Sequence, residues 1–163
     1  MTGSALVDTK LGDDRLEKDA LRDERPRDER LRDERLRAMM AQGWSPALFA
    51  EYWAAPDPAY LRDMVTDDVV GHWPGAGTVE GPDAYISALE QLLAALPDIR
   101  LEVPDSAVDG DVAFVRWVMH ATGVNGPFQM NGVDCVHTRD GRVCENFINF
   151  DAAELRRHTG HSG

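Results

Sequence analysis

The clearest hydrophobic pattern in the chain lies between Gly81 and Pro97. Apolar side chains recur there at the three- and four-residue spacing of an amphipathic helix, namely Tyr85, Ile86, Leu89, Leu92, Leu93 and Leu96. Pro82 fits the first turn of a helix, where its missing N–H is not needed, and Pro97 stops the helix. The pattern therefore predicts a helix between Gly81 and Pro97 with one buried face.

Two shorter helices are predicted upstream. Ser45 can cap a helix that begins at Pro46, and the apolar residues from Leu48 to Trp53 lie along one side of it. Asp57-Pro58 opens a second short helix that ends near Met64.

Five strands are predicted, one before the long helix and four after it. The first lies at 69–73, and alternating apolar and polar residues predict the other four at 99–103, 112–122, 128–138 and 143–150. Turns are expected at Asp109-Gly110, Asn125-Gly126 and Asp140-Gly141, so the last four strands form a meander of hairpins. This order predicts an α+β fold in which a curved antiparallel sheet covers about three helices and encloses a pocket.

Residues 1–37 differ in composition, being rich in Arg, Asp and Glu, and are predicted to be a charged arm outside the folded domain, 38–163. The arm contains a five-residue near-repeat, as in Leu31-Arg-Asp-Glu-Arg35. Five residues turn a helix by about 500°, so its leucines do not form one apolar stripe. Pro26 blocks a continuous helix, although 27–42 can be helical; residues 1–25 are expected to be disordered.

The negative charge of the chain argues against two classes of binding partner, nucleic acids and anionic membranes. The 163 residues carry a net charge of −12, and 18 of the 29 acidic side chains but only 7 of the 17 basic ones lie beyond residue 37. So acidic a domain repels nucleic acid and anionic membranes, and no apolar run resembles a signal peptide or a membrane span. We expect a cytoplasmic protein in which Cys135 and Cys144 are reduced.

Several segments together resemble a known family. They are LRDMVTDDVVGHWPGAGTVEG at 61–81, the helix GPDAYISALEQLLAALPD, the strand DGDVAFVRW and the hairpin GVDCVHTRDGRVCENFINFD. Their order is similar to that of SnoaL-like polyketide cyclases, within the nuclear transport factor 2-like superfamily. The resemblance covers roughly 45–160 and implies a cone-shaped α+β barrel, a deep apolar pocket and a homodimer. It does not fix the reaction, because relatives include cyclases, isomerases, epoxide hydrolases, dehydratases and non-catalytic binding domains.

Asp134 and Asn146 are the leading candidates for chemistry. A loop of Arg139, Asp140 and Gly141 would place Asp134 opposite Asn146 on a mostly apolar face, which should line the pocket. Burial there should raise the pKa of the carboxyl, as a general acid or base requires. The resemblance also places Asp134 where ketosteroid isomerases carry the protonated aspartate of their oxyanion hole. The alternative is a buried carboxylate that Asn146 merely satisfies.

The other catalytic candidates are His120 and His72. A two-residue turn at Asn125-Gly126 would place Trp117 opposite Asp134 and His120 outside, whereas a bulge near Gly123 would turn His120 into the pocket. Alternation turns Trp73 inward and His72 outward, although the resemblance places His72 at the pocket mouth.

The pocket wall is predicted to be aromatic and aliphatic, formed by Tyr52, Trp53, Trp73, Trp117, Met119, Met130, Ile148 and Phe150. The resemblance places Trp73 where isomerases carry their base and Ile148 where cyclases carry a catalytic aspartate, so neither known mechanism transfers intact. No metal-ligand spacing, phosphate-binding loop or nucleophile motif occurs, and no metal or cofactor is expected.

These observations predict a cofactor-independent enzyme that moves a proton during cyclisation, isomerisation or dehydration of a hydrophobic oxygenated molecule, such as a polyketide or terpenoid. Asp134 would be the acid or base and Asn146 its partner. Two alternatives remain: a non-catalytic ligand-binding module of the same fold, favoured by Ile148, and an interaction protein whose arm recruits a larger partner.

Removing residues 1–25 should leave the stability of the domain nearly unchanged, because this segment has no apolar stripe to bury. Thermal and urea unfolding of the full and shortened chains test this. A loss above roughly 2 kcal/mol, the size associated with lost core contacts, would contradict it.

Overall fold

The computed structural model describes residues 23–161. The chain divides into two units between Arg35 and Leu36. In the first unit, Arg25 donates from Nε to Asp23 Oδ1 at 2.8 Å, and helix α2 (Arg27–Ala41) begins after Pro26. The helix predicted for 27–42 is thereby confirmed. The predicted disorder of residues 1–25 falls almost wholly outside the described residues.

Four of the five helices of the second unit follow the starts and stops that the sequence predicts. The five are α3 (Pro46–Trp53), the 3₁₀ helix η1 (Pro58–Tyr60), α4 (Leu61–Met64), α5 (Pro82–Ala95) and α6 (Ala152–Thr159). Ser45 caps α3 by accepting the Leu48 N–H at 3.1 Å, and Asp57 caps η1 in the same way. Helix α6, capped by Asp151, was not predicted. Across residues 23–161, none of these helices combines the length and apolarity needed to cross a membrane.

Six strands form one sheet. They are β1 (Val65–Trp73), β2 (Gly77–Glu80), β3 (Arg100–Asp109), β4 (Val112–Gly123), β5 (Gly126–Arg139) and β6 (Arg142–Phe150), in the order β2-β1-β6-β5-β4-β3. The α+β class and the meander from β3 to β6 are confirmed. The sheet is mixed rather than wholly antiparallel, because β1 runs parallel to β6, and it stays open instead of closing into a barrel. Strands β1 and β6 are far apart in the chain, so no local sequence pattern indicates whether they pair parallel or antiparallel.

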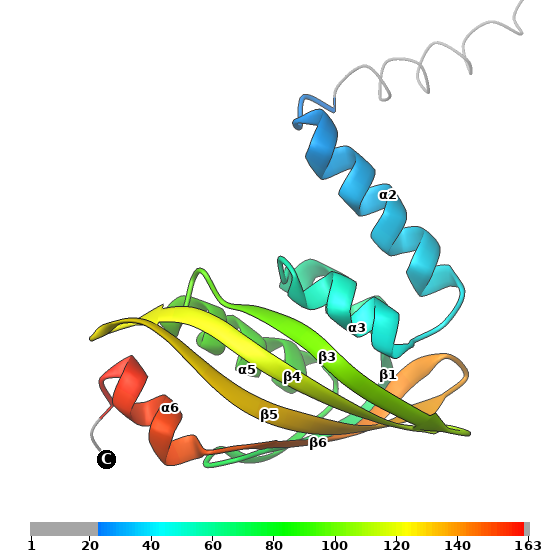
Figure 1. The fold of residues 1–163 in the computed structure, drawn as a ribbon. Coiled ribbons are helices and arrows are strands. Elements are labelled where there is room, and N and C mark those ends of the chain that lie inside the picture. The colour runs from blue at the N-terminus through cyan, green and yellow to red at the C-terminus, as the bar shows by residue number, and fades with distance from the viewer. Residues whose placement is uncertain (1–22, 162–163) are drawn as a thin grey trace, which may run out of the picture. The chain divides into compact units, whose positions relative to one another are not determined.

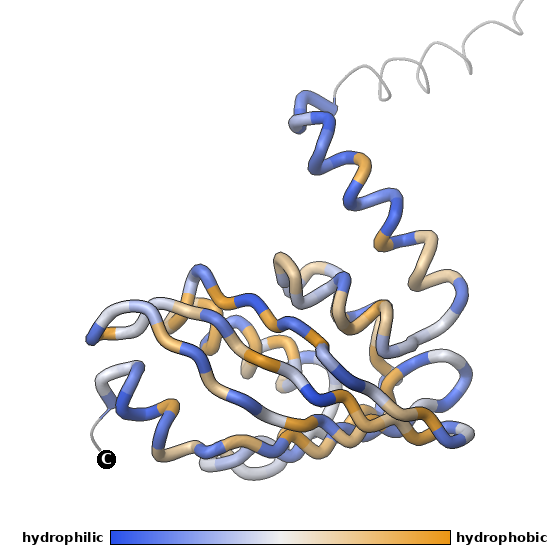
Figure 2. The backbone as a smooth tube through the Cα atoms, in the orientation of Figure 1, coloured by the Kyte–Doolittle hydropathy of each residue, from blue (hydrophilic) through white to orange (hydrophobic). Residues whose placement is uncertain are grey.

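The curved sheet wraps around α3 and α5 (Figure 1). Hydrophobic and hydrophilic positions alternate along the central strands (Figure 2), so one face of each is buried. Two hydrophobic clusters fill the interior, one between the helices and β1, the other between α3 and the meander. Four side chains pack against both clusters, namely Trp44, Trp53, Leu92 and Leu93.

Both predicted hairpin registers are wrong by two residues. Between β5 and β6, Arg139 pairs with Arg142 around a two-residue turn, and Asp134 therefore lies opposite Ile148 instead of Asn146. Between β4 and β5, Gly123 pairs with Gly126, and Trp117 lies opposite Gly132 instead of Asp134. A shift of two residues keeps every side chain on its face, because side chains alternate with a period of two.

A bulge explains the register of β6. Asp140 and Gly141 form the turn with φ of 53° and 76°, a combination that suits the twist of a hairpin. Thr138 then pairs with Val143 but His137 with Glu145, which leaves Cys144 as the extra residue. The additional residue thus lies in the strand, and not in the loop as predicted.

Candidate functional site

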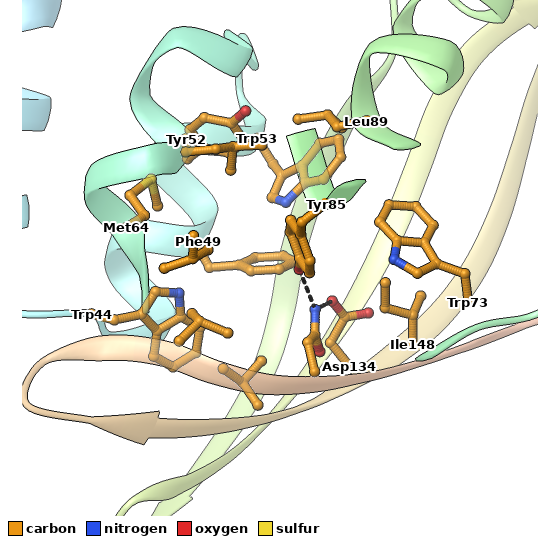
Figure 3. Close-up of a pocket in the computed structure, with 15 residues that line it drawn as sticks. Trp44, Phe49, Tyr52, Trp53, Met64, Trp73, Tyr85, Leu89, Asp134 and Ile148 are labelled. Atoms are coloured by element: carbon orange, nitrogen blue, oxygen red, sulfur yellow. Dashed lines mark hydrogen bonds between the residues drawn. The ribbon is translucent and has the colours of Figure 1, made fainter. Parts of the chain in front are cut away.

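Two adjoining cavities lie between the helices and the sheet. The inner one has a volume of about 60 Å³ and is walled by α3, α4, α5 and strands β1, β5 and β6 (Figure 3). The outer one has a volume of about 190 Å³ and is also bordered by β3, β4 and Leu155 of α6. Four residues border both cavities, namely Trp53, Trp73, Asp134 and Ile148.

Among the described residues, Asp134 is the single carboxyl group on these walls. Its side chain is almost fully buried, with 5% exposed. Trp117 donates from Nε1 to Oδ1 at 2.8 Å, and Asn146 donates from Nδ2 to Oδ2 at 3.0 Å. Burial raises the pKa of Asp134 to about 6, although both hydrogen bonds act in the opposite direction. A group with such a pKa exchanges protons near neutrality.

The contact between Trp117 and Asp134 depends on Gly132. The two residues Gly132 and Asp134 share one face of β5, and Trp117 lies opposite Gly132. A Cβ atom at position 132 would lie 2.1 Å from Trp117 Cζ2, so the indole occupies the space of the missing side chain. The ring can therefore lie across β5, with its N–H against the carboxyl.

Asn146 links the carboxyl to Tyr85, at the start of α5. Its Nδ2 donates to the Tyr85 hydroxyl oxygen at 3.1 Å as well as to Asp134, so both amide hydrogens are used. The buried Oδ1 of Asn146 and the buried Nε1 of Trp73 have no hydrogen-bond partner among the described residues. Burial raises the pKa of Tyr85 to about 12, so its hydroxyl stays protonated.

Tyr85 was missed by sequence reasoning, which treated it only as part of an apolar helix face. The available signal was its hydroxyl. A tyrosine among leucines on a buried face usually finds a polar partner, and that partner marks a polar point in the interior.

The two histidines lie on the opposite face of the sheet. His72 Nε2 is 3.2 Å from Glu145 Oε2, and its ring stacks on Phe147. His120 Nε2 is 3.2 Å from Glu102 Oε2. The pairing of β4 with β5 has no bulge, so the alternative in which His120 turns into the pocket is wrong. Neither ring borders the cavities of Asp134.

Seven of the eight predicted wall residues border a cavity. Tyr52 borders the inner one, and Trp117, Met119 and Phe150 border the outer one; Trp53, Trp73 and Ile148 border both. Met130 does not. It pairs with Met119 across the sheet and is buried in the second hydrophobic cluster, so only Met119 of the pair reaches the wall.

Helix α6 completes the outer cavity with Leu155 and was not foreseen. The β4–β5 hairpin holds its C-terminal end: Val124 N–H donates to the His158 carbonyl oxygen at 2.8 Å, and Phe128 stacks on the His158 ring. The absence of a side chain at Gly123 permits this approach, since a Cβ atom there would lie 2.3 Å from that oxygen.

Comparison with known proteins agrees with this architecture. Residues 47–146 match the profile of the SnoaL-like domain. The chain belongs to that family. No curated protein matches the chain.

Solved structures share the fold. A proposed polyketide cyclase from Bacillus cereus ATCC 10987 has 22% identity and a TM-score of 0.62, over 72% of this chain and 80% of its own. TerC, co-crystallised with polyporic acid, has 21% identity and a TM-score of 0.62, over 71% and 99%. IdmH, a proposed polyketide cyclase from Streptomyces antibioticus, has 20% identity and a TM-score of 0.58, over 76% and 97%.

Gly132→Ala should destabilise the domain by roughly 1–3 kcal/mol, the usual cost of overpacking, because the new methyl group meets the Trp117 indole. A double-mutant cycle with Trp117→Phe, followed by urea unfolding, isolates this contact. The glycine substitution should cost at least about 1 kcal/mol less beside the smaller ring. Equal costs in both backgrounds would show that the indole does not depend on Gly132.

The unfolding free energy of the domain should depend on pH through the protonation of Asp134. Its folded pKa of about 6 lies above the ordinary 3.8, so the folded state binds the proton more tightly. The stabilisation from this proton is complete below pH 3.8 and is lost as the pH rises through about 6.

Asp134→Asn cannot titrate at this position and serves as the reference. The unfolding free energy of the parent minus that of the variant should fall by about 2 kcal/mol between pH 4 and pH 7. Urea unfolding at a series of pH values measures this difference. A difference that stays constant or rises with pH would contradict a buried carboxyl of raised pKa.

Proposed function

We propose that this SnoaL-like domain is a small-molecule enzyme that transfers a proton within a hydrophobic oxygenated substrate, without a cofactor. The observation that carries the proposal is the position of Asp134: a buried carboxyl of raised pKa at the junction of two apolar cavities. Desolvated ionisable groups in a cavity are typical of catalytic sites.

In the proposed reaction, the ionised Asp134 accepts a proton from a carbon next to a carbonyl group. The electrons of the broken C–H bond move toward the carbonyl carbon, and its π electrons move to the oxygen to form an enolate. The enolate takes the proton back at another carbon, or attacks a second carbonyl to close a ring and leave an alkoxide that Asp134 protonates, or expels a hydroxyl group that Asp134 protonates. These are isomerisation, cyclisation and dehydration.

The surroundings of Asp134 suit this task. Trp117 and Asn146 each bind one carboxyl oxygen and so fix the direction in which the remaining lone pairs point. The apolar walls shield Asp134 from bulk water, which limits the hydration of its carboxylate. The polyporic acid in the TerC complex and the proposed cyclase activity of two similar structures support a hydrophobic oxygenated substrate of the polyketide type.

Asp134→Asn should lower turnover by about two to four orders of magnitude, because the amide keeps the shape of the carboxyl but cannot accept the proton. The assay screens the parent protein against polyketide- and terpenoid-like compounds, starting with polyporic acid, and then compares the variants on the compound that reacts. Glu145→Gln is the matched control: it neutralises a carboxyl on the opposite face of the sheet and should leave turnover unchanged. Equal turnover in the parent and in Asp134→Asn would remove Asp134 from the mechanism.

A second candidate function is a binding module that holds its ligand without chemistry. Within residues 23–161, Asp134 is the single carboxyl on the cavity walls, and no Lys, Arg or His borders them. Ile148 fills the position opposite Asp134 with an aliphatic side chain. Tight binding of a compound that the parent protein leaves unchanged, together with no turnover of any compound in the screen, would favour this function.

A further inference from the structure

The inner cavity contains hydrogen-bonding capacity that no described residue uses. Asn146 donates its two amide hydrogens to Asp134 and Tyr85, while its buried Oδ1 accepts no hydrogen bond from any described residue. The Tyr85 oxygen accepts one of those hydrogens, and within residues 23–161 the structure gives its own hydrogen no acceptor. An open acceptor and an open donor thus lie on two side chains that contact each other.

Such groups are costly when buried without a partner. Asn146 has 5% of its surface exposed and Tyr85 has 8%, so bulk water does not compensate them. A hydroxyl group complements the pair, because it donates one hydrogen and accepts another at the same oxygen. A carbonyl group would satisfy Tyr85 alone, and an ammonium group would satisfy Asn146 alone.

We propose that Tyr85 and Asn146 form a recognition site for a ligand hydroxyl group, with the Tyr85 O–H donating to its oxygen and Asn146 Oδ1 accepting its hydrogen. This inference rests on the proposed function, since it names the substrate class of the same site. In this proposal Tyr85 and Asn146 bind the ligand, while Asp134 remains the residue that transfers the proton.

The cavity volumes define the rest of the ligand. A cavity of about 150 Å³ is known to hold a benzene ring, so the outer cavity of about 190 Å³ accommodates one ring with small substituents. The inner cavity of about 60 Å³ has room for a hydroxyl group and little more. The substrate class is therefore an apolar ring that carries a hydroxyl group. With the ring in the outer cavity and the hydroxyl in the inner one, its atoms pass Asp134, which borders both.

A matched pair of probes tests the recognition of the hydroxyl group. 4-Methylphenol and 1,4-dimethylbenzene have nearly the same shape and differ by a hydroxyl in place of a methyl group. Binding to the full chain is measured by titration calorimetry and by chemical shifts at constant pH. We expect 4-methylphenol to bind the parent protein about tenfold tighter or more, because the dimethyl compound leaves both polar groups unpaired.

Tyr85→Phe removes the donor and keeps the ring. It should weaken 4-methylphenol about three- to tenfold and leave 1,4-dimethylbenzene unchanged or tighter. Tyr60→Phe is the matched control, since Tyr60 is buried but borders neither cavity, and both affinities should stay as in the parent.

Equal binding of the two probes by the parent would overturn the proposal. So would a Tyr85→Phe variant, folded by circular dichroism, that keeps the full preference for 4-methylphenol. These results are distinguishable from a failure of the proposed enzymatic function, because the probes report binding without turnover. A preserved hydroxyl preference with unchanged turnover in Asp134→Asn would sustain this site and reject the role of Asp134.

Discussion

The burial of one carboxyl group is the constraint on which the rest of the site depends. Asp134 lies in an apolar interior with two neutral N–H donors and no cation among its hydrogen-bond partners. A cation would favour the ionised form strongly and lower the pKa toward or below its ordinary value. Two neutral donors instead offset part of the desolvation, which leaves the pKa at about 6 and both protonation states within reach. The neighbouring residues matter mainly because they maintain this balance: Gly132 makes room for the indole, and the surrounding apolar side chains keep the carboxyl out of bulk water.

The second donor depends on a local irregularity in β6. With the two-residue turn at Asp140-Gly141 and no bulge, regular pairing would place Phe147 opposite Asp134 and turn Asn146 to the outer face. The extra residue at Cys144 reverses the alternation beyond it. Asn146 then lies on the inner face, diagonal to Asp134 and within hydrogen-bond distance. The bulge is therefore part of the site, although Cys144 itself does not line the cavities.

This arrangement also explains what the sequence could predict. The helices with proline starts, the meander and the inward faces of Asp134 and Asn146 follow from local patterns, because a period of two survives a register error of two residues. The sequence analysis assumed a three-residue loop without a bulge, whereas the structure has a two-residue turn and a bulge at Cys144. Both arrangements add one residue before Asn146, so both place it on the inner face. Tyr85, the parallel pairing of β1 and the closure by α6 depend on contacts between distant segments. A single sequence carries only weak signals for these, such as a polar hydroxyl on an apolar helix face.

A site with one carboxyl restricts the chemistry that the proposed enzyme performs. Two carboxyls on opposite sides of a substrate can remove a proton from one face and deliver another to the second face. Here Ile148 lies opposite Asp134 in the sheet, and Trp73 borders the same junction, so neither position supplies a second acid. In the proposed function, Asp134 therefore returns the proton that it has taken to an atom within its own reach. In the proposed function this favours reactions in which the proton leaves and arrives on the same side of the ring, with Tyr85 and Asn146 holding the far hydroxyl so that the ring does not turn over between the two steps.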